Sequence, residues 1–412
     1  MIPEATLSCI GCGNKIEHDR VVYSCPRCGD LLEVKLENLS SVDASLLKER
    51  WRSRPIGVWR YRELIPLRGE RYITLHEGGT PLYRCGKLAR WAGVKELYVK
   101  FEGANPTGSF KDRGMCVGIT KALESGRQAV ICASTGNTSS SMSAYAAAAG
   151  MKSIVLIPRG RIALGKLFQT LLYGARTIAV KGSFDDALNM VMQLRDSKDL
   201  YILNSINPWR IEGQKTLAYE LYDQLGMGDY VVSVPVGNCG NISAIWKGFS
   251  ELIELGLLNG SPTMLGVQAE GASPFADMIL KGHETLKPLE EPRTIATAIR
   301  IGKPANWKKA LRAVRDSGGT VAKVSDWEIV EAQRALASLE GIGVEPASAA
   351  SLAGVKKLVE EGRLDRDSTV VCISTGTALK DPNEELLRGI EFSEVEPNVD
   401  SAKPLIEEIL KP

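Results

Sequence analysis

Residues 100–114 read KFEGANPTGSFKDRG, an order that predicts a strand end, a turn and a helix start. The apolar run at 97–101 predicts the strand, and Asn-Pro-Thr-Gly predicts a tight turn. Ser109-Phe110-Lys111 then lead into a helix that is expected over about 113–125. Lys111 would sit at its N-terminus, where free N–H groups and the helix dipole disfavour an ammonium group. A lysine with a lowered pKa suits Schiff-base chemistry, although an exposed lysine in a first turn is the ordinary alternative.

The sequence on either side of this segment alternates between short apolar runs and helical patterns. Further strands are expected at 129–133, 153–157, 176–180, 230–234, 264–268, 320–324 and 369–373, and further helices at 138–149, 162–173, 184–195, 241–255, 306–316, 326–339 and 347–361. This alternation predicts an α/β protein whose parallel sheets are covered by helices on both faces. So many strands favour two α/β units over one sheet. A TIM barrel, which also alternates, is the main alternative.

The nine cysteines fall into two groups. Cys9, Cys12, Cys25 and Cys28 form two C-x-x-C turns separated by 12 residues, with Val21–Tyr23 between them expected as a strand of a small hairpin. Four thiolates suit tetrahedral Zn²⁺, and with four protein ligands the metal is expected to be structural. Iron in place of zinc, a redox motif and a chance pairing are the alternatives. The other cysteines are expected as free thiols: Cys85, Cys116, Cys132, Cys239 and Cys372.

The composition is that of an ordinary globular protein, with 44% hydrophobic and 24% charged residues in a chain of 412. A net charge of +2 gives no electrostatic reason to expect nucleic acid or an anionic membrane as a partner. The sequence has no apolar run long enough for a membrane helix and begins without a signal-peptide pattern. An odd number of cysteines without such a signal favours the reducing cytoplasm.

The Lys111 segment resembles the cofactor-lysine motif of the fold-type II pyridoxal-phosphate (PLP) enzymes. Other segments that resemble this family are Glu77–Leu82, Ala133–Thr138, Pro235–Asn241 and Ser374–Pro382. The resemblance covers about residues 55–385. It implies two interleaved three-layer α/β/α domains of the tryptophan synthase β type, preceded by the small zinc ribbon.

The patterns along the chain and the resemblance together predict a domain organisation. The expected parts are a zinc ribbon at 1–36, a helical linker at 37–62, a large PLP domain at 63–112 and 215–390, a small α/β domain at 113–214, and a tail at 391–412 that ends in a short helix at 404–410. Relatives of this kind are commonly dimers, so a homodimer is expected.

Several residues acquire cofactor roles by this resemblance. Lys111 would hold PLP covalently, Asn137 would bind the pyridine O3′, and Thr375 would face the pyridine nitrogen. A neutral hydroxyl there leaves the nitrogen largely unprotonated, which favours eliminations and replacements over transamination. The cofactor phosphate would lie on a glycine-rich loop at a helix start, formed by Gly237, Asn238, Cys239, Gly240 and Asn241. Taken alone, such a loop is equally typical of an ordinary strand-to-helix turn.

The substrate residues follow from the same resemblance. Ser134 and Thr135 would grip a substrate carboxylate, although helix capping is the ordinary role of such residues. A substrate phosphate would be bound by Thr138, Asn204, Ser205 and Arg210. The guanidinium of Arg210 offers a bidentate fork for a dianion, whereas its ordinary role is that of a surface arginine at a helix start.

Further segments look specifically like the threonine synthase family: Gly57–Tyr61, Asn204–Thr216, Ile299–Gly302, Glu345–Ala350 and Leu379–Pro382. The implied reaction is γ-elimination of phosphate from O-phospho-L-homoserine followed by β-addition of water, which gives L-threonine. Lys111 would be the general base, assisted by the departing phosphate.

The sequence departs from the family at one place. Thr377-Ala378 stands where His-Gly or Asn-Gly is usual before Leu-Lys-Asp-Pro. A cysteate synthase that uses O-phosphoserine and sulfite is therefore the alternative enzyme. A non-catalytic zinc-ribbon sensor built on the same fold is the alternative outside catalysis.

Overall fold

The structure, a computed structural model, describes residues 3–159, 164–226, 228–382 and 394–410. The chain divides into two compact units, Met1–Pro382 and Asn383–Pro412. Among the described residues, no helix combines the length and apolar character that crossing a membrane requires.

The larger sheet of the first unit has six strands. Their order is β12 (Thr320–Val324), β11 (Thr263–Ala269), β10 (Val231–Pro235), β13 (Thr369–Ser374), β5 (Glu96–Phe101) and β4 (Leu82–Arg84). All neighbours pair in parallel except β4, which runs antiparallel to β5. The central register pairs Val99 with Cys372, and both side chains are buried.

The smaller sheet has four parallel strands. Their order is β8 (Arg176–Val180), β7 (Lys152–Pro158), β6 (Ala129–Ala133) and β9 (Leu200–Ile202). Every residue of β6 is buried, because alternate side chains serve opposite faces. Val130 belongs to the core that includes Met142 of α4, whereas Ile131 packs with Val191 of α6. Two separate open sheets are present, so the TIM barrel alternative is wrong and the three-layer α/β expectation is confirmed.

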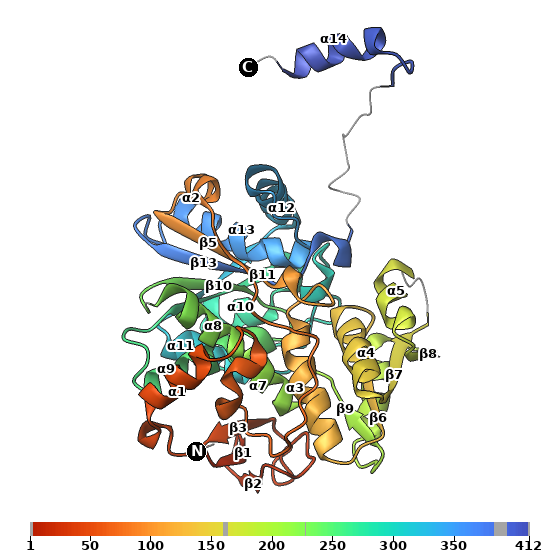
Figure 1. Cartoon of the computed structure of the whole chain (residues 1–412), viewed down its shortest axis with the longest axis vertical. Coiled ribbons are helices and arrows are strands. Elements are labelled where there is room, and N and C mark those ends of the chain that lie inside the picture. Colours follow the sequence, from red (N-terminus) through yellow and green to blue (C-terminus); the bar gives the residue numbers. More distant parts are fainter. Residues whose placement is uncertain (1–2, 160–163, 227, 383–393, 411–412) are drawn as a thin grey trace. The chain divides into compact units, whose positions relative to one another are not determined.

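Helices cover both sheets (Figure 1). In the first unit they are α1 (Ala44–Arg52), α2 (Gly86–Ala92), α3 (Lys111–Glu124), α4 (Asn137–Ala149), α5 (Leu164–Leu172), α6 (Phe184–Gln193), α7 (Pro208–Gln214), α8 (Thr216–Leu225), α9 (Gly240–Glu254), α10 (Pro274–Leu280), α11 (Trp307–Asp316), α12 (Asp326–Glu340) and α13 (Pro346–Glu360).

The expected helices agree with these bounds to within a few residues. Residues 162 and 163, the expected start of one helix, lie outside the described residues. The expected linker at 37–62 contains α1 and a 3-10 turn at Leu39–Ser41, and a second 3-10 turn, Val58–Leu64, begins within it and ends beyond it. The domain boundaries given above stay a prediction.

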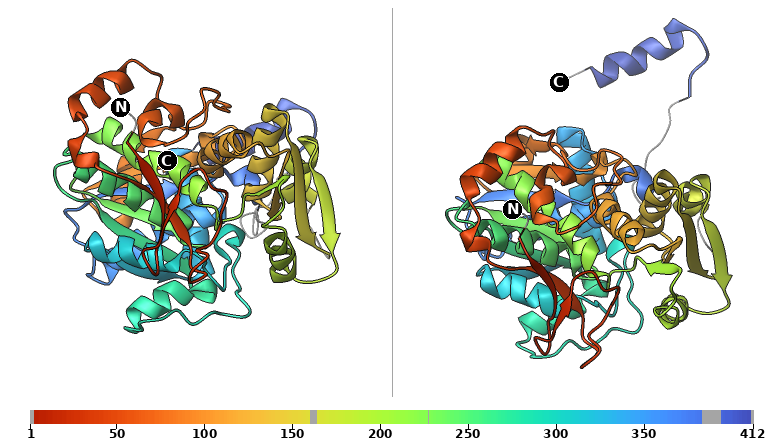
Figure 2. Two further views of the ribbon diagram at one scale, coloured as in Figure 1. Left: turned by 90° about the horizontal axis from the view of Figure 1, so that it is seen from below. Right: turned by 60° about the horizontal axis from the view of Figure 1, so that its bottom comes forward.

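The N-terminal ribbon is an antiparallel sheet of order β2 (Lys15–Glu17), β1 (Ala5–Cys9) and β3 (Leu32–Leu36). The expected strand at Val21–Tyr23 is wrong. Tyr23 is instead buried against the four-stranded sheet, where its hydroxyl accepts a hydrogen bond from the N–H of Ile202 at 2.8 Å. The apolar and aromatic side chains that suggested a strand therefore dock the ribbon. Its strand β3 packs against α7. The ribbon strands are coloured red in the right-hand view of Figure 2.

The second unit contains α14 (Val399–Ile409). The expected short helix at 404–410 is therefore wrong at its N-terminal end. The helix begins earlier because the Asn398 side chain caps it by accepting a hydrogen bond from the N–H of Ser401 at 3.0 Å. Pro404 lies inside the helix rather than at its start.

Candidate active site

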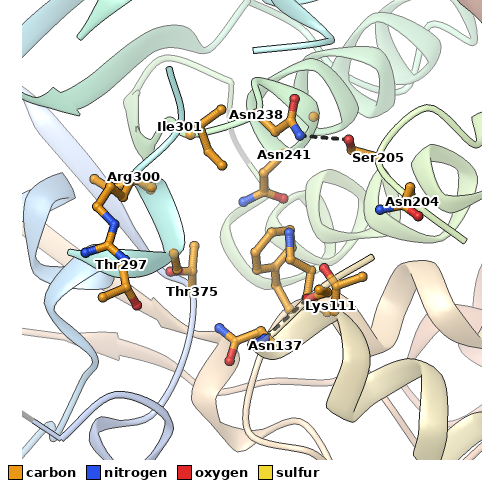
Figure 3. A pocket seen from close by; sticks show the side chains of 18 of the residues that line it. Lys111, Asn137, Asn204, Ser205, Asn238, Asn241, Thr297, Arg300, Ile301 and Thr375 are labelled. Carbon is orange, nitrogen blue, oxygen red and sulfur yellow. Dashed lines mark hydrogen bonds between the residues drawn. The ribbon is translucent and has the colours of Figure 1, made fainter. Parts of the chain in front are cut away.

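A cavity of about 480 Å³ lies where β6, β10 and β13 end. Ligands of α/β proteins bind at such carboxyl ends of parallel strands. All the residues to which the sequence assigned a cofactor or substrate role line it: Lys111, Ser134, Thr135, Asn137, Thr138, Asn204, Ser205, Arg210, Gly237, Asn238, Cys239, Gly240, Asn241 and Thr375. Figure 3 shows Lys111, Asn137, Asn241 and Thr375 around this space.

Lys111 is the first residue of α3, as the sequence predicts. Its pKa is lowered to about 7, chiefly by burial and then by the positive charge of Arg210, while Glu345 acts in the opposite direction. Its Nζ lies 4.2 Å from the ring centroid of Phe110. The lowered pKa is thus confirmed in direction, but its main cause is the enclosing protein rather than the helix terminus.

This shift predicts that the stability of the ligand-free protein depends on pH. The amine titrates at about 7 in the folded chain and near its ordinary value of 10.5 when unfolded. Between these values the unfolded state binds more protons, so the Lys111 contribution to the unfolding free energy rises with pH. Urea denaturation should show this free energy rising more steeply from pH 7 to 9 in the wild type than in Lys111→Met. Equal slopes for the two proteins would contradict the lowered pKa.

Glu345 is a site residue that sequence reasoning did not assign. Its buried carboxylate accepts hydrogen bonds from Asn137 Nδ2 at 3.0 Å and from Thr375 Oγ1 at 3.2 Å. Burial raises its pKa. The two residues expected to hold the cofactor ring therefore share one acidic neighbour. Its position directly before the start of α13 resembles an ordinary helix cap, and the sequence does not reveal that it is buried.

The Gly237–Asn241 loop joins β10 to α9. Cys239 has φ +63° and precedes the first residue of the helix, so the first-turn N–H groups of α9 are available at the loop. Both side-chain polar atoms of Asn241 are buried without a protein partner. A Cβ on Gly237 would lie 2.9 Å from the Cα of Ile299, so the wall leaves no room for a side chain there. Unpartnered donors on a tight helix-start loop fit a phosphate group.

Cys239 is not suited to act as a nucleophile. Burial raises the pKa of its thiol well above the ordinary value, so the reactive thiolate is disfavoured. It serves as a small residue of the loop, as expected.

The loop after β6 is held by its own backbone and by Asn204. The Ser134 hydroxyl accepts a hydrogen bond from the N–H of Gly136 at 3.2 Å. Asn204 accepts from the N–H of Ala133 at 3.1 Å and donates to its carbonyl at 3.0 Å. Asn204 thus ties the loop to the segment that carries Ser205. Thr135 and Thr138 also line the cavity.

Arg210 lies on α7 and is only 3% exposed. Its Nη1 donates to the carbonyl of Leu203 at 3.2 Å, and its Nε has no partner. Burial lowers the pKa of the guanidinium to about 10. Among the described residues no carboxylate forms an ion pair with it, so an anion in the cavity would be its natural partner.

Two glycines bring the helices of Lys111 and Arg210 together. A Cβ on Gly114 of α3 would lie 2.9 Å from the carbonyl oxygen of Arg210, and a Cβ on Gly213 of α7 would lie 1.7 Å from that of Arg113. The backbones of α3 and α7 therefore touch directly. This contact explains why residue 114, the last of the Lys111 segment, is a glycine.

The four ribbon cysteines form a second candidate site. Their Sγ atoms all lie within 4.8 Å of one another, with Cys9 to Cys28 at 3.4 Å and Cys12 to Cys25 at 3.7 Å. Thiolates about 2.3 Å from one tetrahedral ion would be separated by about 3.8 Å. Backbone N–H groups also approach the sulfurs of Cys9 and Cys25 at 3.4 Å each, an arrangement that favours thiolates. The donor set and spacing fit Zn²⁺.

Comparison with known proteins adds independent information. Residues 73–376 match the protein family described as "Pyridoxal-phosphate dependent enzyme". The chain is 53% identical over 404 residues to the threonine synthase of Methanocaldococcus jannaschii, covering 97% of this chain and 99% of that protein. It is 51% identical to the threonine synthase of Methanosarcina acetivorans, covering 97% and 98%. The crystal structure of Escherichia coli threonine synthase superposes with a TM-score of 0.73 at 20% identity, covering 94% and 93%.

Proposed function

The chain belongs to the pyridoxal-phosphate-dependent enzymes and, within them, to the threonine synthases; from this membership we propose that it converts O-phospho-L-homoserine and water into L-threonine and phosphate. The observation that carries the proposal is the pairing of two groups in one cavity. Lys111 supplies an amine whose pKa lies near neutrality, and Arg210 supplies a buried cation without a protein anion.

When PLP is bound, it supplies the electron-withdrawing system that makes protons at the substrate Cα and Cβ acidic. We assign the proton transfers at those carbons to Lys111 Nζ, since an amine with a pKa of about 7 both accepts and returns protons near neutral pH. The Gly237–Asn241 loop holds the cofactor phosphate through N–H groups of α9 and the unpartnered Asn241 amide. Asn137 and the neutral hydroxyl of Thr375 hold the ring.

The substrate is bound at both of its ends. The Ser134–Thr135 loop binds its carboxylate through hydroxyl and N–H groups. Arg210 binds the substrate phosphate together with the hydroxyls of Ser205 and Thr138. The same groups keep the departing phosphate dianion in place. Asn204 supports this site by holding the loop after β6. Charge-assisted hydrogen bonds from a buried guanidinium are strong because little water competes for them.

The Thr377-Ala378 departure lies beside the cavity rather than in its wall. The N–H of Thr377 donates to the Gly108 carbonyl at 3.0 Å, and the N–H of Ala378 donates to that of Gly343 at 3.2 Å. Thr375, Lys380 and Asp381 are the residues of this loop that line the cavity. This placement supports an unchanged substrate.

A phosphate-release assay with product identification tests the function. The purified, PLP-loaded enzyme is given O-phospho-L-homoserine, or O-phospho-L-serine with and without sulfite. Threonine and phosphate are expected in equal amounts from the first substrate. Cysteate from O-phosphoserine and sulfite, without threonine from the first substrate, would overturn the proposal.

We also propose that the enzyme is a cytoplasmic homodimer. Light scattering after size-exclusion chromatography tests whether it is a dimer.

We propose a structural Zn²⁺ on the four ribbon cysteines, supported by the mutual spacing of their Sγ atoms. Elemental analysis should find about one zinc per chain, since all four ligands come from one ribbon. Cys28→Ser should lose most of this zinc and melt several degrees lower, because metal-binding energy contributes to folding. Arg27→Ser, which alters an exposed side chain in the same turn, is the control. It should keep the zinc content and the melting temperature of the wild type. Full zinc retention in Cys28→Ser would contradict the assignment.

A further inference from the structure

The ribbon is attached to α11 at three places. Lys308 forms an ion pair with Asp30, and Arg312 pairs with Glu33, with Nη1 to Oε1 at 3.1 Å. Between them, Lys309 is only 5% exposed and its Nζ donates to the carbonyl of Leu32 at 2.8 Å. Exposed ion pairs contribute little, whereas a buried charge-assisted hydrogen bond is costly to lose. Lys309 is therefore the main attachment.

The residues just before α11 contact the cavity wall. The N–H of Ala305 donates to Asn238 Oδ1 at 2.6 Å. Asn306, only 1% exposed, donates from its N–H to the Asn238 carbonyl at 3.3 Å and from Nδ2 to the Ser205 carbonyl at 3.0 Å. The start of α11 thus holds two residues that line the cavity, Asn238 and Ser205.

These contacts decide the direction of one hydroxyl group. Because Asn238 Oδ1 accepts from Ala305, the amide presents its Nδ2 to Ser205 and donates to Ser205 Oγ at 2.7 Å (Figure 3). A serine hydroxyl has a single hydrogen to donate. Since its oxygen already accepts from Asn238 and no acceptor among the described residues takes its hydrogen, the hydroxyl can donate to an anion in the cavity that Arg210 also lines.

We propose that the zinc ribbon positions Ser205 for phosphate binding, acting through Lys309, α11 and the Ala305–Asn238–Ser205 hydrogen bonds. Lys309 and Asn306 are then positioning residues that touch neither substrate nor cofactor. The ribbon also contacts α7, where the His18 ring lies 6.3 Å from that of Trp209, the neighbour of Arg210. The inference rests on the proposed function in taking the anion to be the substrate phosphate.

A double-mutant cycle on the PLP-loaded enzyme tests the inference, with inorganic phosphate as the probe in isothermal titration calorimetry. Lys309→Met keeps the side-chain volume but breaks the attachment at Leu32. It should weaken phosphate binding about fivefold, and Ser205→Ala about tenfold, each in the range of one lost hydrogen bond. In the Ser205→Ala background Lys309→Met should have no further effect, because Lys309 acts through Ser205. Arg315→Gln, exposed on the same helix, is the control and should bind phosphate like the wild type.

Kinetics provide a second readout. Lys309→Met and Asn306→Ala should raise KM for O-phospho-L-homoserine by about the same factor as the phosphate Kd, with kcat changed less than about twofold. Additive effects of Lys309→Met and Ser205→Ala, or a phosphate Kd in Lys309→Met within about twofold of the wild type, would overturn the inference. A wild type that binds phosphate but does not turn over O-phospho-L-homoserine would overturn the proposed function, while the calorimetric cycle would still test the role of the ribbon.

Discussion

Lys111→Ala is expected to lower threonine formation from O-phospho-L-homoserine by at least about 10³-fold, because it removes both the covalent hold on the cofactor and the general base. Lys380, the other lysine that lines the cavity, also has a lowered pKa, but its Nζ donates a hydrogen bond to Ser140 Oγ at 2.8 Å and is therefore engaged by the protein. Initial rates of phosphate release measure the loss. The visible absorbance of the covalently held cofactor should disappear in the same variant.

Lys87→Ala is the matched control for this experiment, since Lys87 is an exposed lysine on α2. It should keep wild-type activity and absorbance. Lys111→Ala protein that melts like the wild type but retains more than about a tenth of its activity would contradict the assigned role, because a missing general base alone removes about 10²-fold or more.

Arg210→Met is expected to have two effects of opposite sign. Without phosphate the variant should be at least as stable as the wild type, because a buried guanidinium without a carboxylate partner is unfavourable and methionine fills a similar space. Phosphate affinity should fall by about 10²-fold, the usual cost of removing one partner from a buried charge pair. KM for O-phospho-L-homoserine should rise in parallel.

Thermal unfolding with and without phosphate measures both effects at once. The wild type should gain melting temperature as phosphate is added, as mass action requires, and Arg210→Met should not. Arg90→Met, an exposed arginine on α2, is the control and should keep the phosphate response. A variant that is strongly destabilised without phosphate and yet still stabilised by it would show that Arg210 serves the core rather than the ligand.

The sequence predicts most of the layered fold because the buried strands are continuous apolar runs. Ala129–Ala133 is found with the bounds that its pattern indicates, and Lys111 begins its helix as expected. The three-residue strand Leu200–Ile202 was missed because so short a segment shows no periodicity. Val21–Tyr23 was misassigned because β-branched and aromatic residues serve equally well in a strand and in a docking contact.

Motif resemblance selected residues that all line one cavity, but it did not reveal the contacts between them. Glu345 was overlooked because its burial arises from elements distant in the sequence. The link from Lys309 to Ser205 was also invisible, since it joins the ribbon, α11 and the Asn238 loop across more than two hundred residues of chain. Burial and long-range hydrogen bonding are properties of the folded chain, so local patterns do not report them.

Under the proposed function, the contact between the backbones of α3 and α7 limits the length of substrate that the enzyme can hold. In the proposed function Lys111 acts at the amino-acid end of the substrate and Arg210 at its phosphate end. The spacing of their helices is fixed at Gly114 and Gly213, where no side chain fits. The distance between the two helices is therefore determined by main-chain contact and not by side chains. Substitutions of the lining side chains can change how tightly a substrate is held. Accepting a substrate one carbon shorter or longer would require α7 itself to slide along α3.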